Sequence, residues 1–343
     1  MYSLISTLWG VVALGGPLAG GAITDLFGWR WIFLANAPLC LVAAGIAIRG
    51  LSHPPVADRG RPIPLVRSVM LAVTVGLLVA APSADAVVAA ILVVCGLGLG
   101  WVYLREERRA VVPVIPLETW TGRGPVGSSM LATMFVTGGY VGSGVFLPLY
   151  LQNVRLESAF TAGLVLSAGG VCWTVGSLIG VRAQGDWRKR AVVIGALMIC
   201  CGTGGIGLQV ATGPFPLLLT TFSWTVAAVG VGICLLHLMN WAIVFSPPDR
   251  SGVASAAVQT CRLLGSAAGG ALMGALLHGI GSDPAHITTG IAAVFALAAA
   301  FAIMPATLLR PKVSLNQEAG VAEGVEAVAA RDRLSVGAQD QFA

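Results

Sequence analysis

The sequence has very little charge: only 10% of its residues are Asp, Glu, Lys or Arg, while 56% are hydrophobic and the mean hydropathy is +0.86. A water-soluble domain of 343 residues needs far more charge on its surface. A basic segment before the first apolar run is also missing, and further apolar runs follow it. We therefore expect residues 1–24 to span a membrane rather than act as a cleaved signal peptide.

Patterns that bind cofactors or carry out covalent chemistry are missing too. The seven cysteines all lie inside apolar runs without CxxC spacing, which favours a role as small apolar side chains over disulfides or metal ligands. We find no phosphate loop, metal-ligand cluster or nucleophile–base pair, and so predict no cofactor, no metal and no enzymatic activity. The Lys and Arg residues sit in short loops rather than on one soluble face, which argues against nucleic-acid binding.

What the sequence does contain is a succession of apolar runs, each near the length of about 20 residues that a bilayer span needs. They predict an all-α, polytopic membrane protein of about ten transmembrane helices. We expect the polar tail at 310–343 to be mostly disordered and cytoplasmic. The ten predicted spans are 4–24, 30–49, 66–82, 86–104, 126–151, 160–181, 190–210, 216–245, 252–279 and 287–309.

The basic residues sort themselves between the two sides of this predicted topology. When alternate loops are assigned to opposite sides, fifteen Lys and Arg fall on one side and only Arg30 and Arg155 on the other. Cytoplasmic loops carry an excess of Lys and Arg. The sorting therefore predicts a cytoplasmic (inner) membrane protein with both termini in the cytoplasm.

The first fifty residues contain the most specific pattern of the chain. The first predicted span carries GGPLAGG at residues 15–21 and ends at Asp25, and the second opens with WRWIF at residues 29–33. Gly16 and Gly20 form a small-xxx-small face that lets two helix backbones approach closely. Pro17 removes a backbone donor and bends the helix. Close helix packing alone would explain the glycine spacing, but not the whole combination.

Together these residues resemble the antiporter motif (here Gly16, Pro17, Gly20 and Gly21) of major facilitator drug:proton antiporters, most closely the branch with fourteen helices. LPLYLQ at residues 147–152, the basic loop 182–190 and PPDRSG at 247–252 resemble further elements of that family. The resemblance covers roughly residues 1–310 and is weak at 66–104. It implies alternating access between two bundles, a lipophilic or cationic small-molecule substrate and proton coupling.

The resemblance also implies a register for the chain, in which the amino-terminal bundle is incomplete. In this register the first four helices of the fourteen-helix plan are absent, and an upstream segment would have to supply them. The regions are 1–49 (last two helices of the amino-terminal bundle), 50–64 (cytoplasmic linker), 65–104 (two inserted helices), 105–124 (cytoplasmic loop) and 125–309 (carboxy-terminal six-helix bundle).

Five residues are candidates for a translocation pathway or gate. Arg262 is the one charge well inside a predicted span, roughly 15 Å deep at about 1.5 Å per residue. Gln259 shares its helical face. Asn240 and His237 lie in the span before it, and Asp25 lies near the outer membrane face. Three of them have a structural alternative. Arg262 would bond backbone carbonyls or reach the cytoplasmic interface, His237 would be satisfied within the bundle, and Asp25 would be a solvated loop charge.

Two function classes remain open. The first is the carboxy-terminal portion of a small-molecule exporter, embedded in a lipid bilayer. The second is a non-transporting membrane remnant or truncated reading frame. Carboxylates lie only in loops, near interfaces or in the tail, so the chain lacks a deep titratable group of the kind that proton antiport uses. We therefore expect that it does not perform coupled export by itself.

Overall fold

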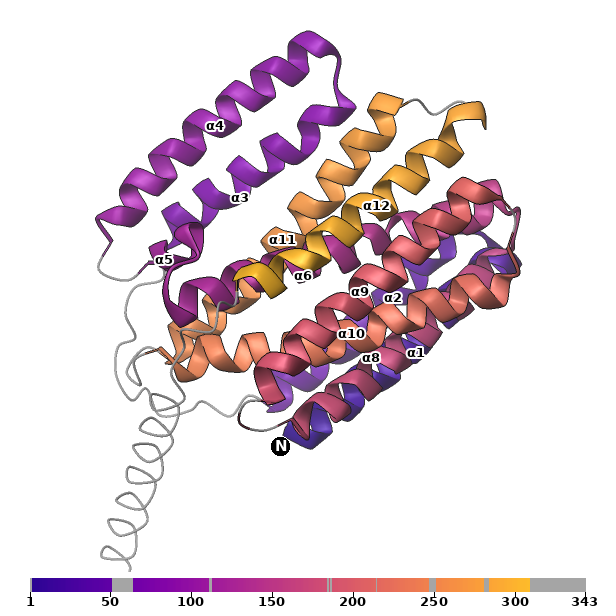
Figure 1. The fold of residues 1–343 in the computed structure, drawn as a ribbon, viewed down its shortest axis with the longest axis horizontal. Helices are drawn as coiled ribbons and strands as arrows, with labels where there is room; N and C mark the ends of the chain where they lie inside the picture. The colour runs from indigo at the N-terminus through magenta and orange to yellow at the C-terminus, as the bar shows by residue number, and fades with distance from the viewer. Residues whose placement is uncertain are drawn as a thin grey trace, which may run out of the picture.

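The computed structural model describes residues 2–50, 64–110, 113–183, 185, 187–213, 215–246, 251–280 and 284–308, and throughout these residues it is built from helices and turns. Each of the ten predicted spans is helical (Figure 1). The predicted tail at 310–343 and most of the linker at 50–64 lie outside the described residues. The main helices are α1 (Tyr2–Phe27), α2 (Arg30–Gly50), α3 (Leu65–Ala80), α4 (Ala86–Arg108), α6 (Gly124–Gly144), α8 (Ala159–Val181), α9 (Trp187–Thr212), α10 (Leu217–Val244), α11 (Ser251–Ile280) and α12 (Pro284–Leu308).

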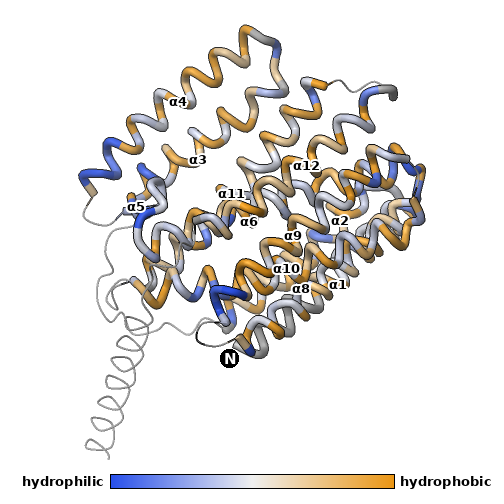
Figure 2. The backbone as a smooth tube through the Cα atoms, in the orientation of Figure 1, coloured by the Kyte–Doolittle hydropathy of each residue, from blue (hydrophilic) through white to orange (hydrophobic). Residues whose placement is uncertain are grey.

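Eight helices are long and apolar enough to cross a bilayer within the described part of the chain, and two more apolar helices are shorter. The shorter pair are α3 and the part of α1 from Val12 to Phe27. Apolar residues cover these helices on most faces (Figure 2). This is the pattern expected where lipid, rather than water, surrounds a bundle. The all-α membrane fold predicted from composition is thus confirmed.

Six helices, α6 and α8 to α12, form one bundle, with α10 packed between α8 and α9, α12 packed against α9, and α6 lying against α11 and α12. Glycines set a close crossing between α6 and α11. Gly265 and Gly269 of α11 meet the backbone of α6, where a Cβ added at Gly138 would lie 2.9 Å from the carbonyl oxygen of Gly265. Gly265 and Gly269, four residues apart, therefore let α11 pack closely against α6.

The other four long helices attach to this bundle from two sides (Figure 1). α1 runs along α8, and α2 packs mainly against α1, with most of its residues exposed. α3 and α4 form a hairpin, joined by the short turn η1 (Ala81–Ser83), and α3 contacts α11.

Two predicted boundaries differ from the structure. The predicted span 126–151 is interrupted: α6 ends at Gly144, a short α7 (Phe146–Leu149) follows, and a π-helical turn η2 (Tyr150–Val154) completes it. Pro148 explains a weak point here, because proline cannot donate a backbone hydrogen bond within a helix. The predicted loop 105–124 begins later than expected, since α4 continues to Arg108, and it contains the short helix α5 (Leu117–Thr121).

Candidate functional site

A cavity of about 420 Å³ lies where α1 meets the six-helix bundle; we term it the inner cavity. Four helices form its walls: α1, α8, α10 and α11. It is mainly apolar, with two hydroxyls, one indole and one guanidinium among its side chains. Its lining residues are Ala13, Gly170, Trp173, Thr174, Ser177, Leu235, Leu236, Met239 and Arg262.

Arg262 is the charged residue among these lining residues, as the sequence suggested. It is partly buried, and its Nη1 donates a hydrogen bond to Oε1 of Gln259 at 3.0 Å, one turn earlier in α11. Its Nε is buried and has no partner within the described residues. The structure thus brings Arg262 and Gln259 together and leaves part of the guanidinium's hydrogen-bonding capacity unused. Such a group can recruit an acceptor from a bound molecule.

Aromatic contacts hold Trp173 in place at the wall of the inner cavity. Its ring packs edge-on against Tyr140 of α6, at a centroid distance of 5.7 Å and an interplanar angle of 78°. Tyr140 in turn stacks on Trp224 of α10, at 4.3 Å and 14°. A ring fixed in this way presents a rigid apolar face to a ligand.

His237 and Asn240, the other two bundle candidates, are not among the residues that line this cavity. His237 is buried in α10, is hydrogen-bonded to the backbone of Gly180 in α8, and lies 6.2 Å from the ring of Trp241. Its Nε2 has no partner among the described residues. Asn240 is exposed. His237 thus has one ring nitrogen bonded within the bundle and one without a described partner. The pathway role of both residues stays a prediction.

The motif glycines of α1 divide into two sets in the structure. A Cβ added at Gly16 or Gly20 would meet no other atom within 4 Å, so these glycines face open space. A Cβ added at Gly21 would lie 2.5 Å from the carbonyl oxygen of Ala159, at the start of α8. Gly163 of α8 lies against the carbonyl of Pro17. The close approach between α1 and α8 therefore involves Gly21, and among the described residues no neighbouring helix packs against Gly16 or Gly20.

Pro17 shapes the same contact through the hydrogen bond that it cannot make. Without an N–H, it leaves the carbonyl of Ala13 without its usual helical donor. That carbonyl faces α8, 2.8 Å from a Cβ added at Gly170, and Ala13 lines the inner cavity. One residue further on, Ser167 of α8 donates its hydroxyl to the carbonyl of Leu14 at 2.8 Å. The segment of α1 before Pro17 thus presents backbone acceptors to α8 and to the cavity.

Asp25 joins the two parts of the chain at the opposite end of the α1–α8 contact. Its Oδ1 accepts a hydrogen bond from the backbone N–H of Ala159 at 3.1 Å, and its Oδ2 accepts one from Phe160 at 2.8 Å. These are among the first N–H groups of α8, which have no acceptor within the helix. A carboxylate there also interacts favourably with the helix dipole. Asp25 is therefore a capping group for α8, which neither sequence alternative anticipated.

One carboxylate that the sequence placed near an interface is fully buried. Glu107, in the last turn of α4, accepts from Nη1 of Arg67 in α3 at 3.1 Å and from the backbone N–H of Ile115 at 2.9 Å. Its side chain has no exposed surface. In the sequence it stands in a run of exposed charges, Arg105 to Arg109, and nothing in that run distinguishes it from Glu106. It fastens the α3–α4 hairpin to the segment before α5.

Among the described residues, no three His, Cys, Asp or Glu side chains gather closely enough to hold a metal ion. The inner cavity instead offers stacking, apolar contact and a guanidinium, which suit non-covalent binding of a small molecule.

Comparison with known proteins decides the family. Residues 1–270 match the sequence model of the Major Facilitator Superfamily. The chain belongs to this superfamily. The resemblance of residues 15–33 to the drug:proton antiporters of that family is confirmed by relatives whose names describe drug efflux pumps.

Three relatives illustrate the match. The chain is 32% identical over 309 residues to the uncharacterized transporter YebQ of Escherichia coli, covering 84% of this chain and 64% of YebQ. It is 25% identical over 267 residues to the methylenomycin A resistance protein of Streptomyces coelicolor, covering 77% and 56%. It is 27% identical over 289 residues to the multidrug efflux pump LfrA of Mycolicibacterium smegmatis, covering 80% and 55%. The chain thus spans about half to two thirds of the length of these relatives.

Proposed function

We propose that this chain supplies one wall of the transport pathway of a proton-coupled exporter of lipophilic or cationic small molecules. The observation that carries the proposal is the inner cavity, where α1 meets the six-helix bundle beside Arg262. In major facilitator transporters the substrate site lies near the bilayer midplane, between two halves that rock against each other. A cavity bounded both by α1 and by the bundle is at the corresponding place. The name of LfrA, a multidrug efflux pump, supports the direction of transport.

The basic residues support the proposed location. The excess of Lys and Arg in the loops that follow α2 and α4 supports our proposal of an inner-membrane protein with both termini in the cytoplasm. A transporter rather than an enzyme fits the cavity, which offers binding groups but no nucleophile–base pair among its lining residues.

A transport assay in proteoliposomes tests the proposal. Residues 1–343, alone and fused behind the part of YebQ that precedes its matched region, are reconstituted under an imposed proton gradient, and ethidium movement is followed by fluorescence. We expect gradient-driven movement in the fusion. Arg262→Ala should reduce it at least about tenfold, since it removes a charge held in the membrane interior, and Arg262→Lys should retain part of it.

The controls separate a pathway role from a folding defect. Arg190→Ala removes an exposed arginine at the start of α9, distant in sequence from the cavity, and should leave transport unchanged. Normal transport by Arg262→Ala would show that this arginine is structural. Movement of ethidium by residues 1–343 alone would overturn the expectation that further helices are needed. No movement in either form would favour the non-transporting alternative.

A further inference from the structure

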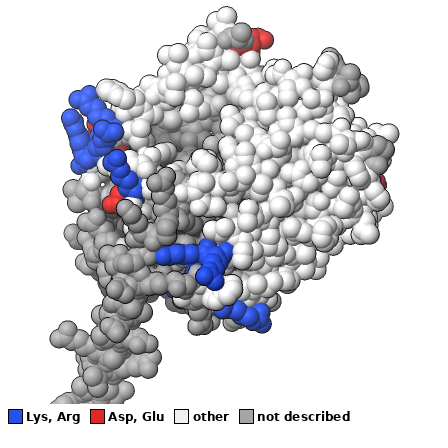
Figure 3. Space-filling model, in the orientation of Figure 1, with Lys and Arg blue, Asp and Glu red and all other residues white. Residues whose placement is uncertain are grey.

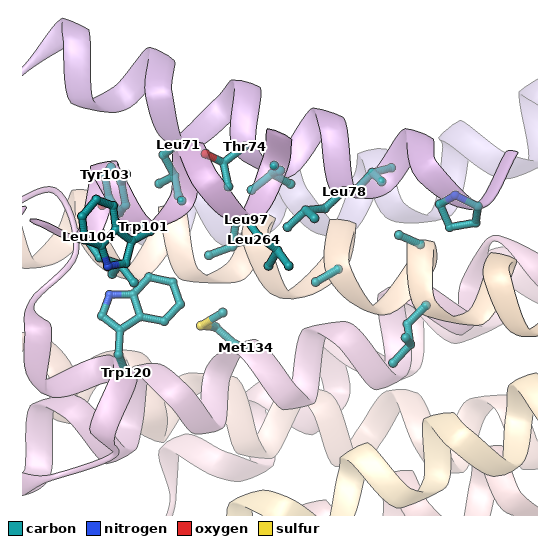
Figure 4. A pocket seen from close by; sticks show the side chains of 18 of the residues that line it. Leu71, Thr74, Leu78, Leu97, Trp101, Tyr103, Leu104, Trp120, Met134 and Leu264 are labelled. Atoms are coloured by element: carbon teal, nitrogen blue, oxygen red, sulfur yellow. The ribbon is translucent and has the colours of Figure 1, made fainter. Parts of the chain in front are cut away.

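A second cavity, of about 600 Å³, lies between the α3–α4 hairpin and the six-helix bundle (Figure 4); we term it the hairpin cavity. Its walls come from α3, α4, α5, α6 and α11. It shares no lining residue with the inner cavity. The two sites can therefore be tested separately.

Hydrocarbon dominates the wall of the hairpin cavity. Leucine, alanine, valine and glycine supply most of it, no charged side chain lines it, and Trp101 and Trp120 stand at one end beside Leu104 (Figure 4). The cavity opens sideways, because Leu97 and Trp101 of α4 are 61% and 63% exposed. Ions and hydrophilic solutes would lose their hydration in such a space without compensation. An apolar lipid chain that enters from the bilayer has no such hydration to lose.

The length of the cavity matches one leaflet of a bilayer. Its α3 side runs from Leu71 to Pro82, which at 1.5 Å per residue is about 16 Å. The hydrocarbon core of a bilayer is about 30 Å thick, so a single leaflet is about 15 Å. One acyl chain therefore fits along the cavity.

Positive charge gathers at the end of the cavity where the two tryptophans lie. The guanidinium of Arg105 sits over the ring of Trp101, 5.6 Å from its centroid. Arg108 and Arg109 follow, both exposed. Figure 3 shows Lys and Arg side chains gathered on the surface at this side of the molecule. The exposed acids nearby in sequence are Glu106 and Glu118, and the charge of Glu107 is matched by Arg67. Exposed arginines thus outnumber exposed acids at this end.

A buried hydroxyl lies at the depth where a lipid carries its ester groups. Thr74 lines the cavity, is 8% exposed, and its Oγ1 has no partner within the described residues. Its methyl group lies opposite Gly100, 3.1 Å from an added Cβ. Gly100 precedes Arg105 by five residues, so Thr74 lies about 7.5 Å below Arg105 along the helix. If the phosphate of a bound lipid lies at Arg105, the ester carbonyls of that lipid would reach the level of Thr74.

We propose that the hairpin cavity is a binding site for one anionic phospholipid of the cytoplasmic leaflet. One acyl chain fills the cavity, the ester region lies level with Thr74, and the phosphate lies at Arg105. The inner leaflet of cell membranes carries anionic lipids, and tryptophan and arginine are enriched at its surface. The bound lipid couples the hairpin to α11. This inference does not depend on transport through the inner cavity.

Native mass spectrometry of the full chain in detergent tests this inference. Phosphatidylglycerol and phosphatidylcholine with identical acyl chains are titrated separately, and the fraction of protein with one bound lipid is measured. We expect phosphatidylglycerol to bind about tenfold more tightly. Arg105→Gln should weaken it about fivefold, which corresponds to the roughly 1 kcal/mol that one basic residue contributes near an anionic lipid surface.

Matched variants locate the site. Ala268→Phe places a ring in the cavity wall and should abolish the tight binding, whereas Ala256→Phe, at an exposed alanine of α11 that does not line the cavity, should not. Arg190→Gln removes another arginine stacked on a tryptophan, 5.1 Å from the ring of Trp187, and should leave binding unchanged. Arg105→Gln, on the surface, keeps the test valid should Ala268→Phe fail to fold.

Three results would overturn the inference. Equal binding of the two lipids would mean that only general lipid contacts are present. Unchanged binding in both Arg105→Gln and Ala268→Phe would place the lipid elsewhere. If the lipophilic cation tetraphenylphosphonium displaces phosphatidylglycerol at a concentration below that of the lipid, the cavity is a substrate pocket instead.

Discussion

Replacing Gly21 with alanine should weaken the contact between α1 and α8, while the same change at Gly20 should not. A Cβ at Gly21 would lie 2.5 Å from the carbonyl oxygen of Ala159 and 2.9 Å from the Cα of Phe160. Both are backbone atoms at the start of α8, where Asp25 binds, so they cannot move aside as a flexible side chain would. A Cβ added at Gly20 would meet no atom of another described segment within 4 Å.

The magnitude follows from two opposing effects. Alanine in place of glycine favours a helix by about 1 kcal/mol, and this gain is the same at both adjacent positions. At Gly21 it is opposed by overpacking, which typically costs about 1–3 kcal/mol. Gly20→Ala should therefore stabilise the chain slightly, and Gly21→Ala should lower its free energy of unfolding by about 1–3 kcal/mol relative to Gly20→Ala.

The assay is unfolding of purified residues 1–343 in mixed micelles with increasing sodium dodecyl sulfate, followed by circular dichroism and tryptophan fluorescence. Size-exclusion chromatography checks that both variants have the same oligomeric state. Equal stability of the two variants would refute the contact between Gly21 and α8. Greater loss at Gly20 would show that the Gly16 and Gly20 face packs against a helix after all.

Three further predictions concern charge. Asp25→Ala should lower the free energy of unfolding by about 0.5–2 kcal/mol, because α8 loses the cap that Asp25 provides. Asp85→Ala should not lower it, since Asp85 precedes α4 without a side-chain capping bond. The same unfolding assay compares the two variants, and equal losses would contradict the capping role of Asp25. Glu107→Gln should lower the free energy of unfolding by about 1.5–3 kcal/mol, because it weakens buried hydrogen bonds to a charged group. Glu106→Gln, at an exposed position, should change it little. The segment before α5 should become more sensitive to protease in Glu107→Gln. Indistinguishable digestion of the two would argue against this fastening. Topology is tested by alkaline phosphatase and green fluorescent protein fusions. Fusions after Leu151 and Asp283 should report a periplasmic position, and fusions after Leu51 and Gln184 a cytoplasmic one. The reverse pattern would refute the assigned orientation.

Fold class and family were accessible from the sequence because each depends on local patterns. A run of about 20 apolar residues inserts into a bilayer whatever its neighbours are. Gly16, Pro17 and the WRWIF segment lie within a few residues of one another, so their combination is visible without coordinates. The depth of Arg262 likewise follows from its distance to the end of its span.

Partners remote in sequence were not accessible in this way. Asp25 binds the N–H groups of Ala159 and Phe160, more than 130 residues away. Glu107 differs from Glu106 only in the direction that the last turn of α4 gives it, inward to Arg67 rather than outward. The two cavities arise where helices from separate parts of the chain meet, and no single span contains either of them.

The sequence by itself determined that this chain spans a membrane, where its helices lie and to which superfamily it belongs. The tertiary structure decided which face of each helix packs: Gly21 rather than Gly16 or Gly20 meets α8, although all three stand in one motif. The physical reason is that lipid and helix interiors are similarly apolar. Hydrophobic periodicity therefore does not mark the packed face of a membrane helix, and shape complementarity between whole helices selects it instead.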